Sequence, residues 1–127
     1  EEAWKAIAKE GMASYVRYLF KTVRKYFGEA IVVTQEVEDI ISSPIVKESI
    51  INNADCKILL DQRKYRNKFD QIQTLLGLTD KERAQVLSIN LSNDPARRYK
   101  EVFISLGGVQ SAVYATEVSD EEYLVRP

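Results

Sequence analysis

The stretch Ala30-Ile31-Val32-Val33-Thr34-Gln35 is short, apolar and rich in β-branched residues, and it ends on two polar side chains. This composition predicts a strand that is buried on both faces, as in a parallel sheet covered by helices. A second apolar run, Cys56-Lys57-Ile58-Leu59-Leu60, has the same character. The chain between the two runs is long enough for the helical crossover of a right-handed βαβ unit. The sequence therefore predicts an α/β fold with a parallel sheet.

Helices are predicted around these two strands. Apolar residues at steps of three and four predict a helix over residues 3–27, or a short helix and a longer one from about residue 12 if Gly11 breaks the run, with Gly28 as the residue just past the end. We expect a short helix or turn over residues 36–41. Ser43-Pro44 has the form of an N-cap followed by proline at the first helical position, and this helix should end at Asn52-Asn53.

The second half of the chain shows a different pattern. An amphipathic helix is predicted over residues 66–77, and Thr79-Asp80-Lys81-Glu82 forms a capping box that opens another helix, so the two make a helical hairpin. From Tyr99 the apolar period falls to two on both sides of Gly107-Gly108, which predicts a β-hairpin. Ser119-Asp120-Glu121-Glu122 begins a terminal turn or short helix.

Composition excludes several classes of protein. The chain has 127 residues, a net charge of −1, 45% hydrophobic and 29% charged residues, which is typical of a soluble domain rather than a disordered chain. With no histidine and one cysteine, it offers no disulfide and no usual ligand set for zinc, haem or iron–sulfur clusters. Catalysis by Ser-His-Asp or Cys-His is excluded for the same reason. No apolar run is long enough to predict a membrane span.

Charge is unevenly distributed along the chain. Residues 1–28 and 63–100 carry an excess of basic residues, whereas residues 29–62 and 101–127 carry an excess of acidic ones. One interpretation is a set of solvated faces on a mixed surface. The other is an acidic edge that meets the basic edge of an identical neighbour, as in a ring assembly.

The polar residues around the first predicted strand suit nucleotide chemistry. Glu1-Glu2-Ala3-Trp4 precedes the first helix, and Thr34-Gln35 follows the strand. Ligands of open α/β sheets bind outside the carboxyl ends of the strands, so these side chains should face one crevice. A carboxylate suits Mg²⁺, an acid can orient or deprotonate the attacking water, and an amide can sense the γ-phosphate.

The order of these motifs resembles that of the ATPases of conjugative type IV secretion, and within them the C-terminal part of the TraG-type proteins of conjugative transposons. Glu1-Glu2-Ala3-Trp4 is similar to their Walker B box. The order continues over essentially the whole chain with Arg24-Lys25, Gly28, Thr34-Gln35, Asn52-Asn53, Gly77-Leu78-Thr79 and the hairpin of residues 98–118.

This resemblance implies a fold: the C-terminal half of a RecA-like P-loop ATPase domain, with a parallel sheet and helices, plus a helical hairpin and a C-terminal β-hairpin. Residues 1–127 would then form a single, partial domain. Its parts would be half of the RecA-like core (1–62), the helical hairpin (63–98) and the β-hairpin (99–127).

The resemblance also implies roles for individual residues. Glu2 matches the catalytic glutamate that activates water, and Gln35 matches the sensor glutamine. Glu1 stands where the family has the aspartate that holds the Mg²⁺ shell, and it is one methylene longer. Arg24 lies where related ring ATPases place an arginine finger, and Arg63 is a weaker candidate for the same nucleotide-binding interface.

No Gly-x-x-x-x-Gly-Lys-Ser/Thr phosphate loop occurs among the five glycines of the chain. We therefore expect a part that starts at Walker B, binds no ATP or Mg²⁺ by itself and does not hydrolyse ATP alone. The resemblance implies that the parent protein is an ATPase that uses ATP and Mg²⁺ to energise conjugative DNA transfer. The parent would form a ring, expected to be a hexamer, with other secretion-channel subunits. It would lie in the cytoplasm, peripheral at the inner membrane, and could contact DNA.

Alternatives remain open on the sequence alone. The parent could be a ring ATPase of the same broad class that pumps DNA, or the chain could be a non-catalytic α/β interaction module. In the last case Glu1 and Glu2 form an acidic terminus, Gln35 is a polar cap and Arg24 caps its helix. The basic run of Arg63, Lys64, Arg66 and Lys68 is either a solvated face or a contact with phosphate or another subunit.

Overall fold

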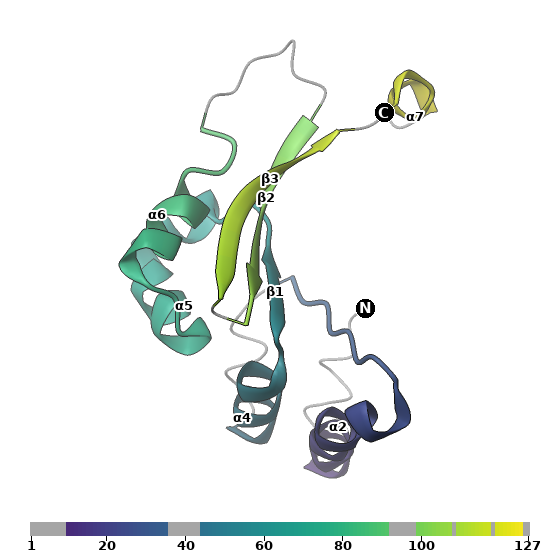
Figure 1. The fold of residues 1–127 in the computed structure, drawn as a ribbon. Helices are drawn as coiled ribbons and strands as arrows, with labels where there is room; N and C mark the ends of the chain where they lie inside the picture. The colour runs from purple at the N-terminus through teal and green to yellow at the C-terminus, as the bar shows by residue number, and fades with distance from the viewer. Residues whose placement is uncertain (1–9, 36–43, 92–98, 108, 118, 126–127) are drawn as a thin grey trace. The chain divides into compact units, whose positions relative to one another are not determined.

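The computed structural model describes residues 10–35, 44–91, 99–107, 109–117 and 119–125, and it divides the chain into two compact units, residues 1–54 and 55–127. The first unit contains α2 (Glu10–Thr22), the 3₁₀ helix η1 (Val23–Tyr26) and α4 (Pro44–Asn53) (Figure 1). The second contains β1 (Cys56–Leu59), the 3₁₀ helix η2 (Arg63–Lys68), α5 (Phe69–Leu76), α6 (Asp80–Leu87), β2 (Tyr99–Leu106), β3 (Gln110–Glu117) and α7 (Asp120–Val125).

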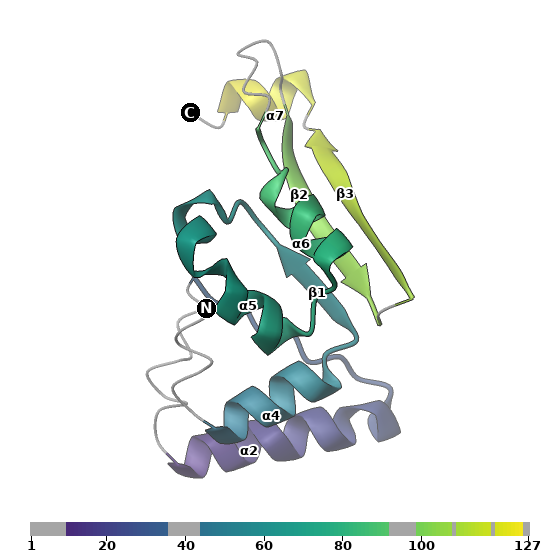
Figure 2. The same ribbon diagram turned by 90° about the vertical axis from the view of Figure 1, so that its left-hand side faces the viewer.

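In the first unit, α2 and α4 pack side by side (Figure 2). The helix predicted over residues 3–27 is confirmed from Glu10 onward, but its last turn is the 3₁₀ helix η1. The left-handed residue that ends it is Phe27, with φ 57°, and not Gly28 as predicted. Gly28 serves a different purpose: its N–H donates to the Val23 carbonyl at 3.1 Å, and a Cβ there would lie 2.9 Å from Val23 Cγ2.

The helix predicted after Ser43 is also confirmed. α4 begins at Pro44, whose missing N–H costs nothing in the first turn, and it ends at Asn53. The Asn53 side chain donates to the Ser49 carbonyl at 2.7 Å, which satisfies one carbonyl of the last turn. Ser43 itself and the turn expected over residues 36–41 lie outside the described residues.

The strand predicted over residues 30–35 is not formed in the described structure. These residues adopt no regular secondary structure, and Ile31 and Val33 are 80% and 55% exposed rather than buried. The preference of β-branched residues for strands reflects packing on a half-buried sheet more than an intrinsic backbone preference. An apolar run therefore forms a strand only when a neighbouring strand can pair with it and its side chains can pack on one face of a sheet.

The sheet of the second unit has three strands in the order β1-β2-β3, and both neighbouring pairs are antiparallel. The strand predicted over residues 56–60 is confirmed as β1, which pairs antiparallel with β2. The predicted parallel pairing with residues 30–35 is not present among the described residues. The predicted β-hairpin is confirmed as β2 and β3. Its turn uses Gly107 at φ 56° and closes with a bond from the Val109 N–H to the Leu106 carbonyl at 3.0 Å.

The helical hairpin of α5 and α6 lies against one face of this sheet (Figures 1 and 2). The buried apolar side chains of the unit are Phe69, Ile72, Leu75, Leu78, Val86, Ile89 and Phe103. Strand side chains alternate between faces, so Ile58 and Leu60, 59% and 62% exposed, point away from this core. The expectation that residues 56–60 are buried on both faces is therefore wrong, and Cys56 is exposed too.

Helix ends in the hairpin follow the predicted local signals. α5 closes at Gly77, which is left-handed at φ 66°. Thr79 caps α6: its Oγ1 accepts from the Glu82 N–H at 3.1 Å, and the Glu82 carboxylate accepts from the Thr79 N–H at 3.1 Å. This is the reciprocal capping box predicted from the sequence. At the C-terminus, Ser119 Oγ accepts from the Glu122 N–H at 3.2 Å, which confirms the short terminal helix α7.

Candidate functional site

The chain turns sharply after β1, and the Asp61 side chain organises that turn. Asp61 Oδ1 accepts a hydrogen bond from the backbone N–H of Arg63 at 3.0 Å. Aspartate favours such turns because its short carboxylate reaches the N–H two residues on. η2 therefore starts with Arg63 in a fixed position beside the end of β1.

The side chain of Arg63 is bound to the same carboxylate. Arg63 Nε lies 3.0 Å from Oδ1 and 2.9 Å from Oδ2 of Asp61, and Nη2 lies 2.7 Å from Oδ2. The two side chains are 48% and 28% exposed, so solvent screens this ion pair and it adds little to stability. Its main physical effect is to fix the orientation of the planar guanidinium.

Asn90 connects this pair to the sheet. Asn90 Nδ2 donates to Asp61 Oδ2 at 3.3 Å. The Asn90 backbone N–H donates to Glu101 Oε1 at 3.0 Å, and Asn90 Oδ1 accepts from the Glu101 N–H at 2.9 Å. Asn90 is left-handed at φ 57°, a conformation that asparagine tolerates better than most residues. The end of β1, the turn after α6 and strand β2 are thus joined by one polar network.

The network keeps the Asp61 carboxyl charged. Partial burial alone would raise its pKa, but hydrogen bonds from the Arg63 side chain, the Arg63 backbone N–H and Asn90 together hold the pKa below its usual value of 3.8. The side-chain hydrogen bond to Asp61 and the negative charge of that carboxylate raise the pKa of the Arg63 guanidinium. Both groups are therefore ionised at neutral pH.

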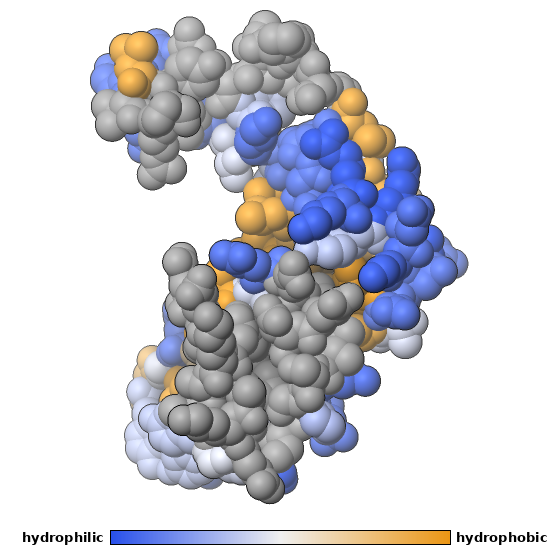
Figure 3. Space-filling view, turned by 180° about the vertical axis from the view of Figure 1, so that it is seen from behind, coloured by the Kyte–Doolittle hydropathy of each residue, from blue (hydrophilic) through white to orange (hydrophobic). Residues whose placement is uncertain are grey.

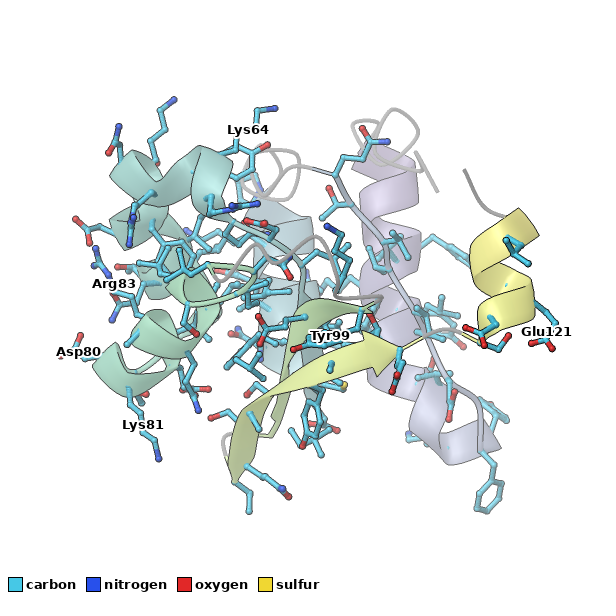
Figure 4. The ribbon with its side chains drawn as sticks, turned by 90° about the horizontal axis from the view of Figure 1, so that it is seen from above. Lys64, Asp80, Lys81, Arg83, Tyr99 and Glu121 are labelled. Atoms are coloured by element: carbon cyan, nitrogen blue, oxygen red, sulfur yellow. The ribbon has the colours of Figure 1, made fainter. Side chains whose placement is uncertain are left out.

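η2 presents further positive charge beside Arg63. Lys64, Arg66 and Lys68 are exposed on the same short helix. Lys64 Nζ lies 5.5 Å from the centre of the Tyr65 ring, and Figure 4 shows it at the surface of the unit. Figure 3 shows hydrophilic residues gathered on the side of the molecule where the helical hairpin lies. The basic run is thus on the surface of the unit.

A second arginine–aspartate pair in this unit has a different environment. Arg83 Nη1, on α6, donates to the Asp70 carboxylate and, at 3.0 Å, to Gln73 Oε1, both on α5. The Arg83 guanidinium also lies 5.9 Å from the centre of the Phe69 ring, and Figure 4 shows Arg83 on the hairpin. This arginine ties α5 to α6, so its role is structural.

The structure describes the five residues predicted for the nucleotide site to different extents. Glu1 and Glu2 lie outside the described residues, and Arg24 is described only as a backbone position of η1. Gln35 is exposed in a bend that follows a segment without regular secondary structure. Those four residues belong to the first unit and Arg63 to the second, and each unit is described by itself. Their convergence around one nucleotide stays a prediction.

Asp61, Asn90 and Glu101 were missed by the sequence reasoning. The Asp61-Gln62-Arg63 spacing is the signal that could have found the turn, because aspartate two residues before an N–H commonly bonds it. Asn90 follows a helix, where a left-handed residue is common. No local signal points to Glu101, whose contact with Asn90 depends on the fold.

In the described parts of the chain, no helix has both the length and the apolar character needed to cross a membrane. Among the same residues, no three acidic or cysteine side chains gather closely enough to hold a metal ion.

Comparison with known proteins identifies the family to which the chain belongs. A family model described as the TraG P-loop domain matches residues 1–126. No curated protein and no solved structure gives a significant match. Because the family model covers almost the whole chain, the chain belongs to the TraG P-loop domain family, which confirms the resemblance drawn from its motifs.

Proposed function

From its place in the TraG P-loop family, we propose that this chain is the C-terminal part of the nucleotide-binding domain of an ATPase that energises conjugative DNA transfer through a type IV secretion system. The observation that carries the proposal is the family match over residues 1–126. The Walker B-like Glu1-Glu2 pair and the glutamine at position 35 occur in the expected order within that match.

The proposed roles follow from side-chain chemistry. Glu2 takes the proton of the attacking water, since a carboxylate is a suitable general base at this position. Glu1 holds the Mg²⁺ shell, for which oxygen donors are the preferred ligands. Gln35 donates its side-chain N–H to a γ-phosphate oxygen or accepts from the attacking water, and its side chain is exposed and so able to contact a ligand. Bound ATP and Mg²⁺ would supply the phosphoryl group and the charge that neutralises it.

Assembly is part of the proposal. Arg24 would reach the nucleotide of a neighbouring subunit, as an arginine finger does. Such an arrangement requires a closed ring, for which we propose a hexamer that works with other secretion-channel subunits at the cytoplasmic face of the inner membrane. The basic and acidic segments of the chain support packing against an identical copy.

The RecA-like parallel sheet is proposed for the complete domain. Residues 30–35 carry β-branched side chains, and Ile31 and Val33 are exposed and able to pack on further structure. We propose that this segment becomes a strand when the remainder of the sheet is present to pair with it.

A glutamine variant tests the proposal in the full-length ATPase that carries this segment. Gln35→Ala should lower kcat for ATP hydrolysis by about 100-fold while leaving the Kd for ATP nearly unchanged, because a misplaced γ-phosphate or water costs rate rather than binding. The measurements are steady-state phosphate release and equilibrium binding of a fluorescent ATP analogue.

Gln110→Ala is the matched control, since Gln110 is an exposed glutamine on the β-hairpin. It should leave both quantities unchanged. Wild-type turnover in Gln35→Ala would contradict the sensor role. A coding sequence with no phosphate loop upstream of Glu1 would contradict the proposed ATPase altogether.

A further inference from the structure

We propose that β3 pairs edge to edge with β3 of a second copy of this chain, so that the two three-stranded sheets join into one sheet about a two-fold axis. The proposal goes beyond the proposed function and does not depend on a nucleotide. It also differs from the ring contact proposed above, because a two-fold contact uses the same surface on both copies and closes on two of them.

β3 is an open edge of the sheet. It is the last strand in the order β1-β2-β3, and Figure 2 shows it along the border of the sheet. One side of β3 pairs with β2, and no strand among the described residues pairs with its other side. An edge strand directs alternate backbone N–H and C=O groups outward, so β3 offers hydrogen bonds to an added strand.

β3 lacks the features that usually protect such an edge. Its eight residues, Gln110–Glu117, include no lysine, arginine or proline, and their pairing with β2 runs without a bulge. The strand at the other border, β1, has only four residues and contains Lys57. Short strands and lysines discourage pairing between edges, so this contrast favours β3 as the site of contact.

The sequence of β3 is compatible with antiparallel pairing to itself. Glu117, at the end of the strand, is its one charged residue. When Tyr114 of one copy lies opposite Tyr114 of the other, no like charges are opposed, and the remaining pairs are Val113 with Ala115, Ala112 with Thr116, and Ser111 with Glu117. Aromatic and β-branched pairs stabilise neighbouring strands, whereas like charges destabilise them. The charge pattern of this edge therefore favours a second copy as the occupant.

Tyr114 is suited to the centre of this contact. It lies in the middle of β3 and is 41% exposed. Its neighbour Val113 pairs with the buried Phe103, so Tyr114 points to the opposite face of the sheet, away from the helical hairpin. The tyrosines of two paired copies would lie side by side on that face.

The test follows association of the 127-residue chain by sedimentation velocity over a range of concentrations. One added strand pair makes a small interface, so we expect a monomer–dimer equilibrium with a Kd of about 10 µM to 1 mM. Tyr114→Lys places two lysines opposite each other and should raise this Kd by at least about 10-fold. Circular dichroism and the melting temperature check that the variant is folded.

A mixture of opposite charges tests the two-fold axis directly. Tyr114→Lys and Tyr114→Glu should each stay monomeric alone, because each opposes like charges. Their equimolar mixture should form dimers again, since lysine then lies opposite glutamate. Ile58→Lys is the matched control: Ile58 is exposed on the same face of the sheet but lies on β1, so its Kd should be unchanged.

Disulfide formation tests the register of the paired strands. In a Cys56→Ser background, Tyr114→Cys should give a disulfide-linked dimer under mild oxidation, because directly opposed residues bring their Cβ atoms within reach. Val113→Cys should not, since Val113 lies opposite Ala115. The two residues 113 are then diagonal neighbours about 7–8 Å apart, which is too far for a disulfide.

Several results would overturn the inference. A monomer at every concentration up to about 1 mM would remove the contact. An equal loss of association in Ile58→Lys would assign it to the open face of the sheet. Species that grow beyond a dimer, or a mixture of Tyr114→Lys and Tyr114→Glu that stays monomeric, would contradict the two-fold axis. Cross-linking through residue 113 and not through 114 would contradict the register. None of these results concerns ATP hydrolysis, so the proposed function is tested separately.

Discussion

Phe27 adopts a backbone conformation that usually belongs to glycine. Its φ is 57°, and its side chain is 100% exposed, so no packing compensates for the unfavourable conformation. Phe27→Gly should therefore raise the free energy of unfolding by about 1 kcal/mol. Urea unfolding of the chain, followed by its helical circular dichroism, measures this change.

Tyr26→Gly is the matched control for that prediction. Tyr26 is an exposed aromatic residue one position earlier, within η1, where glycine is unfavourable. It should lower the free energy of unfolding by up to about 1 kcal/mol. If Phe27→Gly lowered the free energy of unfolding as much as Tyr26→Gly does, the argument about Phe27 would be contradicted.

Sequence reasoning at the scale of single residues reached only local contacts. It assigned the left-handed position to Gly28 because glycine is the usual choice, whereas Phe27 adopts it and Gly28 allows close approach to Val23. It missed the contact between Asn90 and Asp61, because the two residues lie 29 positions apart in the sequence. Such a contact depends on how β1 and α6 are placed by the fold.

At the scale of elements, the capping box should make a measurable contribution. Thr79 and Glu82 satisfy each other's backbone N–H groups at the start of α6. Thr79→Ala should lower the free energy of unfolding by about 1 kcal/mol, since an N-cap oxygen is lost. Urea unfolding of the purified chain gives this difference.

Thr74→Ala provides a control in the adjacent helix. The Thr74 hydroxyl donates to the Asp70 carbonyl within α5 and is exposed, so its loss should change the free energy of unfolding by less than about 0.5 kcal/mol. A Thr79→Ala effect no larger than that of Thr74→Ala would show that the cap adds nothing to stability.

Elements with signals in their own sequence could be predicted, and elements that depend on a partner could not. Pro44, Gly77, the Thr79–Glu82 box and the Gly107 turn each mark a boundary through local backbone chemistry. Residues 30–35 have strand-like composition but adopt no strand. The antiparallel pairing of β1 with β2 joins segments far apart in the chain, and no local pattern encodes it.

At the scale of the whole molecule, the order of short motifs indicated the correct family. Each motif is weak by itself, yet together they indicated a TraG-type protein, and the family match over residues 1–126 confirms it. The roles of Glu1, Glu2, Arg24, Gln35 and Arg63 remain proposals.

The central claim is that this chain supplies the water-activating half of an ATPase site. The most direct measurement is ATP turnover by Glu2→Gln in the full-length protein, together with its affinity for ATP. Loss of a general base should lower kcat by about 100-fold or more while ATP binding is retained. Turnover at the wild-type rate in Glu2→Gln, with ATP binding intact, would contradict the account.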